Sequence, residues 1–255
     1  MKRARRPPDQ RETMMTPDTS GLLEVWEQGA GQPLPVRALL LLRAVMPELD
    51  GETLSRWNIG RRDQLLLELR SAMFGSQVHC ITRCAGCGEA IELDFAIDDI
   101  RVPHGEPGRA YHAAAEGFEV RFRLPDSTDL LALDGAQLAG AERQLLARCL
   151  LEARTEQASV DVAMLPDTVV SAVSREMAEA DPQAEVLLEV SCPACSAVSP
   201  APFDIVSHLW SELDTWARRL LLEVHTLAMV YGWSEAEVLR LSTTRRRAYL
   251  DLVGG

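Results

Sequence analysis

Two short stretches, Cys84-Ala85-Gly86-Cys87-Gly88 and Cys192-Pro193-Ala194-Cys195, decide the fold of this chain. Each is a Cys-x-x-Cys pair, and each lies between two short segments that have the composition of β-strands. A tight Cys-x-x-Cys turn directs two thiolates toward one metal ion, and four thiolates complete the tetrahedral set that structural zinc prefers. The sequence therefore predicts a zinc ribbon whose ligands are Cys84, Cys87, Cys192 and Cys195.

The strands expected around the cysteine pairs are 77–82 and 89–95 for the first pair, and 184–190 and 198–203 for the second. Gly88 suits the positive φ that such a turn needs after its second cysteine, whereas Ser196 stands at the equivalent place in the second pair. The pairs are separated by 104 residues. One metal site is still compatible with this gap, because the entropy of loop closure grows only logarithmically with length. We expect a split ribbon with an insert folded between its halves.

Three other interpretations of the cysteines stay open. A disulfide framework is typical of exported proteins, and a redox Cys-x-x-Cys motif opens a helix within a βαβ unit. The spacing Cys80-x-x-x-Cys84-x-x-Cys87 is also that of a radical SAM iron–sulfur triad, although this chain lacks the alternating strands and helices of such an enzyme. The sequence does not decide whether Cys80 or His79 adds a metal ligand.

The rest of the chain divides around the ribbon into mainly helical segments, and the expected fold class is α+β. The expected divisions are a flexible basic tail at 1–19, a helical unit at 20–75, the ribbon at 76–98 and 184–203, the insert at 99–183 and C-terminal helices at 204–255. In the helical unit, Asp50 is expected to cap a short third helix and Gly75 to end a fourth. The insert is predicted to hold one strand at 118–124 and helices near 127–134, 136–154 and 167–180.

The C-terminal segment has the strongest helical periodicity in the chain. Apolar residues recur every three or four positions from Ile205 to Tyr231, which predicts one long helix. Ser234 and Glu237 form a capping box, so a small helical pair is expected to follow. Further apolar residues lie off the main face of the long helix and indicate a surface for a partner. The candidate partner-binding residues are Trp210, Trp216, Tyr231, Trp233, Arg245, Arg246 and Arg247.

Composition and missing motifs exclude several classes of protein. The 255 residues are 47% hydrophobic and 25% charged, as in an ordinary globular protein, and no apolar run is long enough to span a bilayer. The net charge of −12 argues against wrapping nucleic acid. The sequence contains no nucleophile elbow, phosphate-binding loop or His-Glu-x-x-His motif, and a closed four-thiolate site has no open position for a substrate. We expect a cytoplasmic protein without catalytic activity, whose zinc is structural.

Some stretches of the chain resemble a known family. The run Ile59-Gly60-Arg61-Arg62-Asp63-Gln64-Leu65-Leu66-Leu67-Glu68-Leu69-Arg70, followed by Phe74-Gly75 and the first cysteine pair, resembles small baseplate proteins of T-even-type contractile phage tails. Related proteins occur in phage-derived contractile injection systems. Phe122-Arg123-Leu124-Pro125 and the C-terminal run from Glu223 to Leu250 resemble the same group.

This resemblance implies a structural or assembly component of the baseplate hub, and it carries over no active site. The implied partners are other hub or wedge proteins, with no membrane, nucleic acid or small-molecule substrate. The protein is then either incorporated into a tail-like particle or released as an assembly chaperone, and its copy number is open. The alternative interpretation is a cytosolic zinc-ribbon adaptor or transcriptional regulator, for which the run Arg245-Arg246-Arg247 near the C-terminus would contact an acidic partner or DNA.

Overall fold

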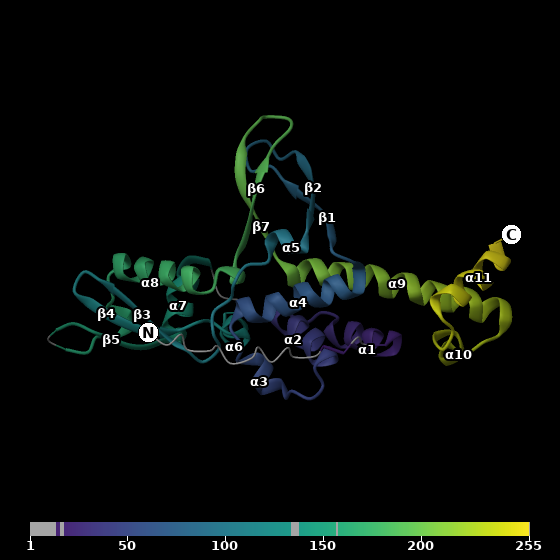
Figure 1. The fold of residues 1–255 in the computed structure, drawn as a ribbon, viewed down its shortest axis with the longest axis horizontal. Coiled ribbons are helices and arrows are strands. Elements are labelled where there is room, and N and C mark those ends of the chain that lie inside the picture. Colours follow the sequence, from purple (N-terminus) through teal and green to yellow (C-terminus); the bar gives the residue numbers. More distant parts are fainter. Residues whose placement is uncertain (1–13, 16–17, 134–137, 157, 255) are drawn as a thin grey trace, which may run out of the picture.

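The computed structural model describes residues 14–15, 18–133, 138–156 and 158–254, so most of the predicted basic tail lies outside the described residues. The fold is α+β and mainly helical, as predicted. Figure 1 shows a helical body from which two β-hairpins project on one side. The insert lies at one end of this body and the C-terminal helices lie at the other.

Four helices form the N-terminal part of the body: α1 (Thr19–Gly29), α2 (Leu34–Val45), α3 (Gly51–Ser55) and α4 (Ile59–Phe74). Asp50 caps α3 as predicted, because its carboxylate accepts a hydrogen bond from the Thr53 N–H at 2.7 Å. Helix α4 ends at Gly75, whose φ of +90° suits a glycine. The predicted start of α3 and the predicted end of α4 are therefore both confirmed.

The long helix α9 (Ile205–Tyr231) completes the core of this body. Leu42, Leu66 and Leu213 are among its fully buried side chains. Arg70 of α4 is buried and makes two hydrogen bonds to Glu212 of α9, at 2.9 and 2.7 Å. The same guanidinium donates to the carbonyls of Gly75 and Gln77. This paired arginine fixes α4, α9 and the start of the first hairpin relative to one another.

The two hairpins carry the cysteine pairs at their tips. The first consists of β1 (Gln77–Arg83) and β2 (Ala90–Ala96), and the second of β6 (Val186–Ser191) and β7 (Val198–Phe203). Each is a separate antiparallel two-stranded sheet. Their facing sides share a small apolar cluster that includes Ile91, Val190 and Ala201. The predicted pairs of strands are confirmed, with boundaries shifted by at most two residues.

The insert between the hairpins contains a three-stranded sheet and several helices. Its elements are α5 (Ile97–Ile100), β3 (Ala110–Ala115), β4 (Phe118–Arg123), α6 (Ser127–Ala132), α7 (Leu138–Cys149), β5 (Leu150–Arg154), the 3₁₀ turns η1 (Val162–Met164) and η2 (Pro182–Ala184), and α8 (Asp167–Ala180). The sheet order is β3-β4-β5. Val120 and Phe122 of β4 pack against Val169 and Val173 of α8, so the insert has a core of its own.

The predicted helix at 136–154 is wrong in its last five residues. The helix ends at Cys149, and Leu150–Arg154 forms the edge strand β5 on β4. The run of leucine, glutamate, alanine and arginine is compatible with a helix, but pairing with an open strand edge overrides that weak preference. Strand β3 was not predicted either. It forms because Glu116 and Gly117 both have positive φ, the conformation of a two-residue hairpin turn.

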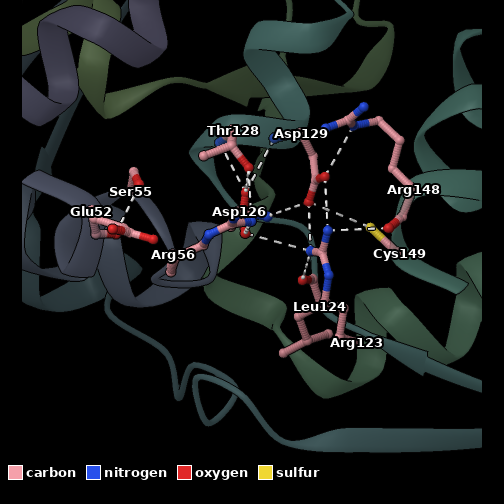
Figure 2. A network of polar contacts seen from close by, with 10 residues as sticks. All are labelled: Glu52, Ser55, Arg56, Arg123, Leu124, Asp126, Thr128, Asp129, Arg148 and Cys149. Carbon is pink, nitrogen blue, oxygen red and sulfur yellow. Dashed lines mark hydrogen bonds and ion pairs between the residues drawn. The ribbon is translucent and has the colours of Figure 1, made fainter. Parts of the chain in front are cut away.

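A network of charged side chains joins the insert to the helical body (Figure 2). The buried carboxylate of Asp129 accepts hydrogen bonds from Arg123 at 2.6 and 2.9 Å and from Arg148 at 3.1 Å. Burial alone would raise the pKa of Asp129, but the bonds from Arg123 and from the Asp126 N–H outweigh it and hold the pKa below its usual value. The neighbouring Asp126 lies 3.5 Å from Arg56 of the body.

We expect Asp129→Ala to lower the free energy of unfolding by about 2–3 kcal/mol, because it leaves two partly desolvated arginines without their shared partner. Equilibrium denaturation in urea is the measurement. Glu119→Ala is the matched control, since Glu119 also pairs with an arginine, Arg154, but on the surface. Exposed pairs contribute about 0–1 kcal/mol. Equal losses from the two substitutions would contradict the role assigned to the buried network.

The C-terminal part consists of the second half of α9, α10 (Glu235–Leu239) and α11 (Thr243–Gly254). Ser234 and Glu237 form the predicted capping box at the start of α10. Val224 and Leu227 of α9 pack against Val238 of α10, and Trp233 and Tyr249 close this cluster. We call residues 218–254 the C-terminal arm.

Candidate metal centre

The four predicted ligands meet between the hairpin tips. The side-chain sulfurs of Cys84, Cys87, Cys192 and Cys195 all lie within 4.8 Å of one another. The Cys84 and Cys195 sulfurs are 3.6 Å apart, as are those of Cys87 and Cys192. These two contacts join one hairpin to the other, so the four sulfurs form a single cluster that both hairpins contribute to.

The two cysteine turns have the same local geometry. The Gly88 N–H donates to the Cys84 carbonyl at 2.9 Å, and the Ser196 N–H donates to the Cys192 carbonyl at 2.9 Å. Gly88 has a φ of +76° and Ser196 a φ of +59°. The second turn therefore adopts the left-handed conformation even though a serine stands where glycine was expected, and the backbone cost at Ser196 is offset by the turn that it completes.

The sulfur positions fit a tetrahedral ion. Four sulfurs at about 2.3 Å from zinc are about 3.8 Å from one another, close to the 3.6 Å separations between the hairpins. A disulfide needs about 2.05 Å, so the paired sulfurs are thiols or thiolates here. Four soft thiolates favour zinc or iron over calcium or magnesium. This four-cysteine cluster can hold a metal ion.

Backbone donors favour the thiolate form at Cys84, Cys87 and Cys195, but contacts among the four sulfurs outweigh them at two of these residues, raising the pKa of Cys87 to about 12 and raising that of Cys195 as well. Hydrogen bonds from the backbone N–H groups of Cys87 and Gly86 lower the pKa of Cys84 to about 6. The Gly86 nitrogen lies 3.3 Å from the Cys84 sulfur. Cys80 and His79 are not members of the cluster; the His79 ring contacts Asp94 of the facing strand instead. The structure thus brings Cys84 and Cys87 together with the second pair rather than with Cys80.

The residues proposed to bind a partner are not all on the surface. Trp210 is buried, with its indole against Gly29 and the Arg37 guanidinium 4.7 Å from its ring centre. Arg246 is buried too, and it pairs with Glu223 at 3.2 Å and donates to the Leu241 carbonyl. The sequence prediction is corrected for these two residues: both lie on faces that pack inward.

The other candidate partner residues remain accessible in part. Tyr231 stacks on Trp233 with ring centres 4.7 Å apart, and both contact the Tyr249 ring. Trp216 and Trp233 are half-buried, whereas Arg245 and Arg247 are exposed. The three aromatic rings therefore pack against one another and stabilise the C-terminal arm. The Arg245 and Arg247 side chains face solvent.

An apolar cavity of about 380 Å³ lies where the helical body, the second hairpin and the insert meet. Ile59, Leu130, Val186 and Phe203 are among its lining residues. Asp63 also lines it, and burial raises the pKa of this carboxyl to about 6 despite the attraction of Arg62, whose Nε lies 2.7 Å away. Asp63 was not recognised from the sequence as an unusual acid.

We expect Asp63→Asn to stabilise the protein at pH 7 by about 1–3 kcal/mol, since a pKa raised from 3.8 to about 6 opposes folding when the group ionises. Between pH 3.8 and about 6, Asp63 is protonated in a larger fraction of folded chains than of unfolded chains. Its contribution to the free energy of unfolding therefore falls as pH rises through this range. The gain in the variant should therefore shrink as pH falls from about 6 to about 4. Denaturation at several pH values measures it.

Asp98→Asn is the control for this pH series, because the Asp98 side chain is 81% exposed and surface substitutions change stability by about 0.5 kcal/mol or less. If Asp63→Asn lowered stability at pH 7, or left the pH dependence unchanged, ionisation of the buried Asp63 carboxyl would not destabilise the folded state, contrary to this prediction.

Comparison with known families identifies the chain. A sequence model of the T4 bacteriophage base plate protein family matches residues 41–208. The chain belongs to this family. The predicted resemblance is thereby confirmed for the matched range, which contains both cysteine pairs and the whole insert. No curated protein and no solved structure matches the chain.

The C-terminal part of the predicted baseplate-family resemblance, from Glu223 to Leu250, lies outside the matched range. That part stays a prediction. Within the described residues, none of the helices combines the length and the apolar character that crossing a bilayer requires. Membership of a baseplate family indicates a structural component of a tail or tail-like particle.

Proposed function

We propose that this protein is a non-enzymatic structural or assembly component of the baseplate of a contractile tail-like injection system, acting through contacts with other hub or wedge proteins. The observation that supports this proposal best is the family match over residues 41–208. The protein would be made in the cytoplasm and then join the particle or leave it as a chaperone.

We also propose that one zinc ion is bound by Cys84, Cys87, Cys192 and Cys195, and that its role is structural. Four thiolates from two hairpins, at separations that suit a tetrahedral ion, support this assignment. With all four positions filled by sulfur, the ion keeps no site for water or substrate.

The position of the proposed metal site, between the two hairpins, suggests what the metal stabilises. The insert leaves the body after β2 and returns at β6, so its two ends are the two hairpins. A metal bound between the hairpin tips would hold these ends together and restrict the insert to one orientation. The segments 20–75, 76–98 with 184–203, 99–183 and 204–255 are then proposed as the units of this assembly.

Fractionation of producing cells tests the functional proposal. Purified tail-like particles, baseplate intermediates and the soluble lysate are compared by quantitative mass spectrometry, in wild-type cells and in cells without this gene. We expect the protein in intermediates or particles, and we expect complete baseplates to be missing without it. Normal, functional particles in the deletion strain would contradict the proposal, and association with DNA instead of baseplate proteins would favour a regulator.

A further inference from the structure

The C-terminal arm, residues 218–254, carries an uncovered apolar stripe on α9. Leu222 is 64% exposed, Met229 is 74% exposed and Val230 is 53% exposed. Residues 222 and 229 are seven positions apart, so their side chains lie on one face of the helix, and Val230 adjoins that face. More than half of the surface of each of these three residues is left open by the described part of the chain. An exposed apolar group of this kind marks an interaction site.

The arm presents this stripe in a fixed orientation. The opposite side of the same helix buries Val224 and Leu227 against Val238. Arg246 of α11 pairs with Glu223 of α9, which holds the last helix in place. Leu239 of α10 packs in a small cluster with Leu23 and Trp26 of α1, which ties the arm to the body. Rotation of α9 to bury the stripe would break all three contacts.

Charge on the arm is opposite to charge on the rest of the chain. From residue 218 to the C-terminus there are six arginines and four carboxylates, a net charge of +2. Residues 1–217 contain twenty basic residues and 34 carboxylates, a net charge of −14. Arg245 and Arg247 are exposed, and their guanidiniums have no ion pair among the described residues. The surface that would meet this arm is therefore negatively charged.

We propose that the arm binds an acidic amphipathic helix of another baseplate protein. The apolar face of that helix covers Leu222, Met229 and Val230, and its carboxylates bind Arg245 and Arg247, where the planar guanidinium allows two parallel hydrogen bonds. Symmetric contact between two arms of this protein is disfavoured because both are cationic. This inference rests on the proposed function in one respect only, namely that the partner is a baseplate protein.

The test uses the full-length protein in cells that produce the particle. A photo-crosslinking amino acid is placed at Met229, and crosslinked peptides are identified by mass spectrometry. In parallel, Leu222→Glu/Met229→Glu and Arg245→Glu/Arg247→Glu are compared with Ile81→Glu/Leu187→Glu. The last variant is the matched control, because Ile81 and Leu187 are 70% and 53% exposed but lie on the hairpins.

We expect crosslinks to an acidic helical segment of another protein, and an at least tenfold loss of both arm variants from baseplate fractions with unchanged zinc content and melting temperature. The hairpin control should remain in those fractions. Crosslinks to a second copy of this chain, or to DNA, would overturn the inference, and so would retention of the arm variants. Absence of the wild-type protein from every baseplate fraction would instead reject the proposed function, while the crosslinks would still report what the arm binds.

Discussion

Replacement of Cys192 by serine is expected to empty the proposed zinc site and to destabilise the protein more than any other single change considered. Cys192 is buried, and its sulfur lies 3.6 Å from that of Cys87 on the other hairpin. Structural zinc contributes on the order of 10 kcal/mol in small zinc domains, so its loss should cost at least about 5 kcal/mol here. The melting temperature should then fall by about 10–20 °C.

Cys80→Ser is the control for this substitution. Cys80 lies four residues before Cys84 on β1, is partly buried and is not part of the four-sulfur cluster. We expect this variant to keep its zinc and nearly all of its stability. A Cys192→Ser protein that kept both zinc and melting temperature would show that the second pair does not ligate the metal. Loss of metal from Cys80→Ser would instead favour the interpretation in which Cys80, Cys84 and Cys87 bind an iron–sulfur cluster.

Gly60→Ala is expected to lower the free energy of unfolding by about 3–4 kcal/mol. A Cβ at this position would lie 2.0 Å from Oδ1 of Asp181, a side chain that is 2% exposed. The Asp181 carboxylate accepts the N–H of Gly60 at 2.9 Å and the N–H of Gly105 at 2.8 Å. Displacing it would leave two buried donors unpaired and remove a negative charge from the N-terminus of α4.

Asp181 matters for the metal centre because it follows α8 directly and precedes β6 by a few residues. Its contact with α4 therefore sets where the second hairpin leaves the body. Gly51→Ala is the matched control, since a Cβ at that helix start meets no atom within 4 Å; we expect no loss of stability there. Urea denaturation compares the two variants, and a cost below about 1 kcal/mol for Gly60→Ala would contradict the close packing.

Local signals in the sequence were sufficient to predict the hairpins, the long helix and the four-sulfur cluster. Each of these signals fixes the backbone conformation of the residues next to it and can be recognised within a few positions. Examples are the Cys-x-x-Cys turns, the Asp50 cap and the Ser234 capping box. The family could be recognised for a similar reason, since its motif at 59–75 is one uninterrupted helix followed by the first cysteine pair.

Most failures of prediction have a common physical cause, which is contact between segments far apart in the chain. Leu150–Arg154 becomes a strand only because β4 offers an edge. Arg246 is buried only because α11 folds back onto Glu223. The raised pKa of Asp63 depends on three segments that close around it. None of these contacts has a signal in the local sequence, although the Glu116-Gly117 turn could have revealed β3.

X-ray absorption at the zinc edge, on the purified full-length protein, is the most direct test of the central claim that the two hairpins share one structural zinc. We predict a colourless protein with one zinc per chain and four sulfur ligands at about 2.3 Å. A brown protein that contains iron and absorbs near about 400 nm, or a zinc with oxygen or nitrogen ligands in place of sulfur, would contradict the account.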